Sequence, residues 1–137
     1  MSGSANRLPR PARHTLSLAA AASLALAGPL AQAQVIELVW TPAGSFERQF
    51  SIAPDKFAEL CGALAKGQSV QWTYEAGSPL DFNIHYHQGS DVVYPARASG
   101  AARSEGTLAV DAAQEYCWMW VNKSAAAVSL QVRLQRR

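Results

Sequence analysis

The chain has 137 residues, of which 49% are hydrophobic and 16% are charged, with a formal net charge of +2. Three of its twelve basic residues lie in the first 33 residues, so the remainder carries nine basic against ten acidic residues, a net charge of about −1. This length supplies one small domain and not two, and the charge supplies no basic face, so we expect no nucleic-acid binding.

The N-terminal segment, residues 1–33, has the pattern of a secretory signal peptide. Three arginines precede an apolar run over residues 16–30, and an Ala-Gln-Ala sequence follows at residues 31–33. That run is shorter than the roughly 20 residues that cross a bilayer, so a membrane anchor is disfavoured. We predict cleavage near Gln34, export to the periplasm or the medium, and one domain over residues 34–137 without a transmembrane segment.

Beyond this segment the dominant pattern has a period of two, which is typical of strands with one buried face. Turn residues such as Ala-Gly-Ser and Lys-Gly-Gln separate the runs. The predicted strands cover residues 35–40, 47–52, 69–76, 80–87, 91–95, 106–111, 115–122 and 127–134. Many short strands at near-regular spacing predict an all-β, antiparallel β-sandwich of about seven or eight strands.

Residues 54–66 depart from this pattern. Phe57, Leu60, Cys61 and Leu64 follow the i, i+3, i+4, i+7 spacing of one helix face. Gly62 in the middle of the segment would cost a helix about 1 kcal/mol. Periodicity therefore leaves helix and strand open here.

Residues 80–87 contain the two histidines that follow the signal peptide. His85 and His87 are two residues apart, so on a strand they share one face with Asn83 and Asp81. Two imidazoles with a carboxylate, for which Asp91 is a candidate, could hold Cu or Zn. Three interpretations stay open: polar side chains on a wet face, a hydrogen-bonded pair packed under a loop, and a metal site.

The most apolar predicted strand covers residues 115–122. Alternation places Tyr116, Trp118 and Trp120 on one face and Met119 on the other. We expect the aromatic side chains in the core, with an exposed platform for a sugar or lipid ligand as the alternative. Met119 is a candidate soft ligand for copper, although a methionine between two tryptophans is more often a core residue.

Cys61 and Cys117 both lie in the exported part, where an oxidising compartment favours a disulfide between them. A bond across their separation of 56 residues is worth about 4 kcal/mol in the chain-entropy model. Two buried free thiols are the alternative. A redox-active pair is disfavoured, because the chain has no Cys-x-x-Cys motif.

The strand sequences resemble the GOLD (Golgi dynamics) domain, a β-sandwich of secretory-pathway cargo receptors and some lipid-transfer proteins. The similarity spans residues 46–134. It rests on Trp72, Tyr74, Asp81, Phe82 and Ile84, on residues 92–95, and on Tyr116, Trp118, Trp120, Asn122 and Ser124. The resemblance implies a GOLD-like or jelly-roll-like sandwich, a strand rather than a helix over residues 54–66, and a binding or interaction module, here as a small exported bacterial-type protein.

The chain shows no nucleophile motif such as Gly-x-Ser-x-Gly and no phosphate-binding glycine loop. The alternative is a cupin-like metal-dependent enzyme centred on His85, His87 and Asp91, but cupins usually add a histidine from a later strand, and none follows His87. We therefore predict a non-catalytic module that binds an unknown protein or small ligand through one edge or face, with Cu or Zn at the His-x-His strand as a candidate ligand.

Overall fold

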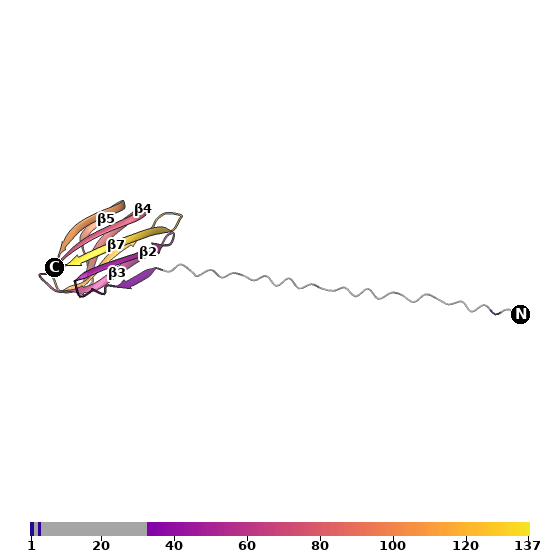
Figure 1. Ribbon diagram of the computed structural model, residues 1–137, viewed down its shortest axis with the longest axis horizontal. Helices are drawn as coiled ribbons and strands as arrows, with labels where there is room; N and C mark the ends of the chain where they lie inside the picture. Colours follow the sequence, from indigo (N-terminus) through magenta and orange to yellow (C-terminus); the bar gives the residue numbers. More distant parts are fainter. Residues whose placement is uncertain (2, 4–32) are drawn as a thin grey trace.

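The structure is a computed structural model that describes Met1, Gly3 and residues 33–137; the predicted signal peptide lies almost wholly outside the described residues. Seven strands and no helix occur in residues 33–137 (Figure 1). The strands are β1 (Gln34–Glu37), β2 (Ser45–Ile52), β3 (Phe57–Leu64), β4 (Ser69–Gln88), β5 (Asp91–Ala109), β6 (Gln114–Val121) and β7 (Val128–Arg136). No helix long and apolar enough for a membrane span is found in the part that the structure describes.

A long hairpin of β4 and β5 belongs to both layers of the sandwich (Figure 1). Residues 70–76 of β4 pair with β7, which pairs in turn with β2, and these strands form the first layer. Residues 81–85 of β4 pair with β6, which is followed by β3 and β1, and these form the second layer. All pairs are antiparallel except that of β1 with β3, so the predicted antiparallel sandwich is confirmed.

The continuity of β4 and β5 corrects the predicted strand boundaries. Residues 69–76 and 80–87 were expected as two strands separated by a turn, and so were residues 91–95 and 106–111; each pair is one strand. The hairpin has register shifts between Glu75 and Leu80 and again towards Tyr86. Such bulges bend a strand without reversing it, so the Ala-Gly-Ser sequence carries β4 from one layer to the other.

Residues 57–64, for which periodicity left helix and strand open, form strand β3. It pairs with β6 over eight residues, so the helical spacing was misleading and the strand implied by the family resemblance is confirmed. Gly62 has a tertiary reason: a Cβ at this position would lie 2.7 Å from the Cβ of Leu38. Gly62, which counted against a helix, therefore leaves the space that the side chain of Leu38 occupies after β1.

The core is built around aromatic side chains, as predicted. Trp118 and Trp120 have no exposed area and Tyr116 is 1% exposed. The rings of Tyr74, Phe82 and Trp120 are in mutual contact, with centroids 5.0 to 5.8 Å apart. Because their rings are enclosed, Tyr116, Trp118 and Trp120 do not form the exposed platform considered as an alternative.

Asn122 joins the end of β6 to both layers and explains part of the family resemblance. Its buried Nδ2 donates to the carbonyl oxygens of Ile52 at 2.9 Å and Ala126 at 2.8 Å. Its Oδ1 accepts from the backbone N–H of Ser124 at 2.9 Å and from the hydroxyl at 2.7 Å. A buried amide with satisfied polar atoms fixes this connection, so the Asn-x-Ser pattern has a structural role.

Gly106 supplies a first test of the packing. A Cβ on this residue of β5 would lie 2.7 Å from Cζ2 of Trp72, the buried side chain opposite it in β4. We expect Gly106→Ala to lower the free energy of unfolding by about 1–3 kcal/mol, as overpacking does. Urea denaturation measures this change.

The matched control is Gly77→Ala in β4. Its added Cβ meets only the backbone of Ser129, at 3.9 Å, which is ordinary contact. We expect this variant to be neutral or slightly stabilising, because alanine has less conformational freedom than glycine in the unfolded chain. Equal losses of stability in the two variants would contradict the tight contact at Trp72.

Candidate functional site: the histidine face

The outer surface of the second layer carries the chemically distinctive side chains. In β4 and β6, Ile84 and Trp118 point into the core, so the residues next to them point outward. Register places Cys61, Cys117 and His85 in one row across β3, β6 and β4, and Glu59, Met119 and Asn83 in the next row. We call this surface, with His87, the histidine face.

His85 is the buried member of the histidine pair, with 6% of its area exposed. Its Nδ1 lies 2.8 Å from Oδ1 of Asn83, and its Nε2 lies 3.5 Å from Oε1 of Glu59, so the ring reaches across β6. Burial lowers the pKa of His85, an effect that the carboxylate of Glu59 opposes and His87 reinforces. The lowered pKa favours the neutral ring, and when Nδ1 donates to Asn83, the unprotonated Nε2 lies towards the carboxylate of Glu59.

His87 is exposed, and its ring centroid lies 5.5 Å from that of His85 with the ring planes at 84°. The two imidazoles share one face, as alternation predicted. They differ in environment, because only His85 is enclosed by hydrogen-bonding neighbours. The pair therefore fits neither of the two interpretations without a metal, in which both histidines are exposed to solvent or both are packed under a loop.

Of the two further candidate ligands, Asp91 lies away from the histidines, and Met119 lies on the face opposite the tryptophans, as alternation predicted. Asp91 is exposed at the first residue of β5, opposite Gln88 at the hairpin end, and does not line the groove that holds the histidines. The proposed grouping of His85, His87 and Asp91 is therefore not assembled. Met119 is partly exposed on the histidine face rather than in the core, because it alternates with the buried tryptophans.

The predicted disulfide between Cys61 and Cys117 is confirmed. The two residues are directly opposite each other in β3 and β6, with Cα atoms 4.1 Å apart. The bond lies in a groove of about 500 Å³ that also contains both histidines and three glutamates, Glu37, Glu59 and Glu115. The sequence did not reveal these acids as a group, because they come from three different strands.

Exposed apolar side chains lie in this groove and beside its two histidines. Val35, in register with Glu59, is 72% exposed, and Val92 is opposite His87. Tyr94 is 42% exposed; its ring centroid is 5.9 Å from that of His85, and the guanidinium of Arg97 stacks on it at 3.6 Å. Exposed apolar residues next to polar and charged groups are typical of protein-binding surfaces.

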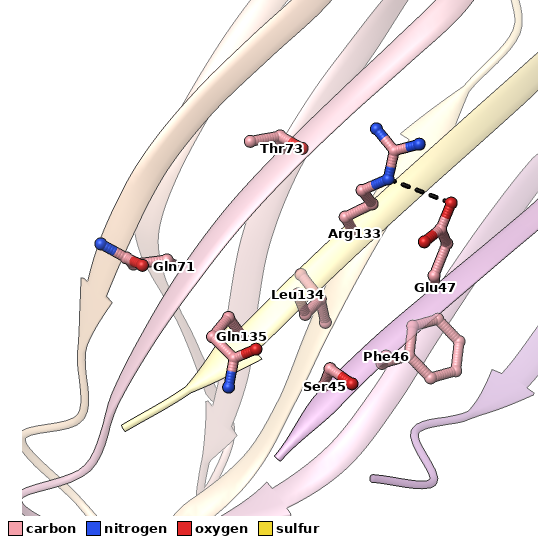
Figure 2. A pocket seen from close by; sticks show the side chains of 8 residues that line it. All are labelled: Ser45, Phe46, Glu47, Gln71, Thr73, Arg133, Leu134 and Gln135. Carbon is pink, nitrogen blue, oxygen red and sulfur yellow. Dashed lines mark ion pairs between the residues drawn. The ribbon is translucent and has the colours of Figure 1, made fainter. Parts of the chain in front are cut away.

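The outer surface of the first layer is different in character. Figure 2 shows a hollow of about 330 Å³ over β2, β4 and β7, in which Arg133 points towards Glu47. Arg133 Nε is 3.0 Å from Oε1 of Glu47, which also accepts a hydrogen bond from Gln131. The two charged side chains here are paired with each other, and the other lining residues are uncharged, two of them the apolar Phe46 and Leu134. The histidine face, which has imidazoles and three glutamates, is therefore the stronger candidate for binding.

No protein-family model matches the sequence, and no curated protein matches it. Solved structures share the fold. A periplasmic inhibitor of g-type lysozyme from Aeromonas hydrophila has 16% identity and a TM-score of 0.59, over 77% of this chain and 98% of that chain. Its counterpart from Salmonella Typhimurium has 16% identity and a TM-score of 0.53, over 77% and 100%. The pre-peptidase C-terminal domain of a Bacillus anthracis collagenase has 10% identity and a TM-score of 0.52, over 80% and 99%.

At these identities the likeness concerns the fold alone. The chain covers nearly the whole length of each of these structures, so the β-sandwich fold is shared over their full extent. None of the three is a GOLD domain, and the GOLD resemblance stays a prediction.

Proposed function

We propose that the domain is an exported, non-catalytic module that binds another protein through the histidine face. The observation that carries this proposal is the exposure of apolar side chains on this face: Val35 lines the groove, and Val92 and Tyr94 lie next to its histidines. Export is supported by the predicted signal peptide, by the disulfide, and by the periplasmic origin of two proteins with a similar fold.

The charges of the face indicate the chemistry of the partner. Three glutamates line the groove, while Arg97 is held on the ring of Tyr94. A partner with lysine or arginine beside an apolar patch complements this arrangement, since opposite charges speed encounter and buried apolar contacts supply affinity. We name a g-type lysozyme as the first candidate, because two proteins of similar fold are inhibitors of that enzyme.

Binding to a g-type lysozyme tests the proposal. We expect the purified protein to slow cell-wall hydrolysis by the enzyme and to bind it in calorimetry. Tyr94→Ala should weaken binding about tenfold or more, as the loss of an aromatic anchor does. Thr73→Ala, on the outer surface of the first layer, is the control and should bind as the wild type.

Two results would contradict the proposed binding of a g-type lysozyme through the histidine face. A g-type lysozyme that is neither bound nor inhibited at micromolar concentration refutes that partner. Loss of binding in Thr73→Ala with full binding in Tyr94→Ala refutes the histidine face as the binding surface.

A second candidate function is the binding of Cu(II) or Zn(II) by His85 and His87. The supporting observation is the carboxylate of Glu59, 3.5 Å from Nε2 of His85, which supplies the acid that Asp91 does not. Two imidazole nitrogens with a carboxylate or water suit these ions. The cupin-like enzyme has less support, because no third histidine is present after residue 87.

Copper titration tests this second candidate. We expect one equivalent of Cu(II) at pH 7.5 and weaker binding below about pH 6.5, where histidine ligands take up protons. Because the pKa of His85 is lowered, this ring stays available as a ligand to a lower pH than an ordinary histidine. His85→Ala and His87→Ala should each abolish binding. Equal copper uptake by the wild type and the double variant would refute the site.

A further inference from the structure

We propose that the Cys61–Cys117 disulfide covers a latent Zn²⁺ site, which forms when a dithiol reduces the bond. The proposed ligands are the two thiolates, the carboxylate of Glu115 and the imidazole of His87. This proposal does not depend on partner binding or on copper binding by the oxidised protein.

The donor atoms are already gathered. Among the described residues, Cys61, Glu115 and Cys117 are the three whose ligand atoms all lie within 4.8 Å of one another. His87 lines the same groove and is exposed, so its ring has room to turn towards them. Two sulfurs with one nitrogen and one oxygen are a donor set that tetrahedral Zn²⁺ accepts.

The strands hold both cysteines in place without the bond between them. β3 and β6 pair over eight residues and are flanked by β1 and β4, so reduction leaves the sulfurs on neighbouring strands. Tetrahedral Zn–S bonds of ~2.3 Å place two sulfurs about 3.8 Å apart. Side-chain rotation can supply this separation once the bond is reduced, because the Cα atoms of the two cysteines are only 4.1 Å apart on paired strands.

A reductant can reach the bond. Cys61 is partly exposed, and the groove in which the disulfide lies is open to solvent and has room for a small dithiol. The dithiol transfers two electrons and two protons: one thiolate attacks a disulfide sulfur, the mixed disulfide is resolved by the second thiol, and the reductant leaves as its own disulfide. Zn²⁺ then displaces the two thiol protons, so each ion bound releases two protons.

The test compares oxidised and reduced protein. The protein is reduced with dithiothreitol, desalted without oxygen, and titrated with Co²⁺ as a spectroscopic substitute and then with Zn²⁺. We expect one equivalent bound, a thiolate-to-cobalt charge-transfer band, and at least 100-fold weaker binding to the oxidised protein. Since two protons are released, affinity should fall roughly 100-fold per pH unit below about pH 8.

Variants assign the ligands. Cys61→Ser with Cys117→Ser should remove the charge-transfer band and the tight site, and Glu115→Gln should weaken binding about tenfold. Glu105→Gln, an exposed acid of β5 opposite Thr73, is the matched control and should bind as the wild type.

Three outcomes would overturn the proposal. The first is equal zinc affinity in the oxidised and reduced proteins. The second is tight binding that survives the double serine variant but not His85→Ala with His87→Ala, which would assign the metal to the histidines alone. The third is a reduced protein that loses its β-sheet spectrum and does not regain it with Zn²⁺, because the donors would then not be held together.

Discussion

Trp120→Ala is expected to lower the free energy of unfolding by about 3–5 kcal/mol, the range for large aromatic side chains deleted from a core. Trp120 has no exposed area and contacts the rings of Phe50, Tyr74 and Phe82, with centroids 5.6 to 6.2 Å away. These residues come from both layers, so the cavity would lie where β4 crosses between them. Urea or guanidinium denaturation at pH 7 measures the change.

Trp120→Phe is the matched control. It keeps a ring in the cluster and removes an indole N–H that has no hydrogen-bond partner among the described residues. We therefore expect a smaller loss, about 1–2 kcal/mol, from the reduced volume. A loss below about 1 kcal/mol in Trp120→Ala would mean that this aromatic cluster does not support the core.

Removal of the disulfide is expected to have an effect of similar size. For a separation of 56 residues, the chain-entropy model gives about 4 kcal/mol. Cys61→Ala with Cys117→Ala should therefore lose up to this amount, a large share of the 5–15 kcal/mol that keeps a small domain folded. Denaturation of the variant and of reduced, alkylated wild type measures the change, and intact mass without reductant verifies the bond in the wild type.

The stability lost on reduction of the disulfide also provides a test of the proposed zinc site. Zn²⁺ should restore stability to the reduced wild type, because a ligand that binds only the folded state stabilises it, and should not stabilise the alanine variant. Unchanged unfolding midpoints after removal of both cysteines would contradict a stabilising role of the disulfide.

The fold class was determined by the sequence itself. Period-two alternation is a property of each strand alone, so it survives whatever the strands pack against, and it correctly placed Trp72, Ile84 and Trp118 in the core. The cysteine pairing was also predictable, because the chain has only two cysteines, both after the predicted signal peptide, and export to an oxidising compartment would favour a bond between them.

Strand continuity and strand type were decided by tertiary structure. The residues of β3 suit one face of a helix as well as one face of a strand, and pairing with β6 on one side and β1 on the other selects the strand. The Ala-Gly-Ser sequence in β4 has the composition of a turn, yet β5 stays paired beside it on both sides of the bend. Local sequence does not specify such partners, because they come from distant parts of the chain.

The contacts and charges of the histidine face were likewise decided by tertiary structure. Alternation placed His85 and His87 on one side of a strand, but it could not show that Glu59 reaches one ring or that Asp91 lies at the hairpin end. Hydrogen-bonding partners, burial and the lowered pKa of His85 depend on the register between β3, β6 and β4. Register is set by the burial of whole strand faces, so it is a property of the assembled sheet rather than of any one segment.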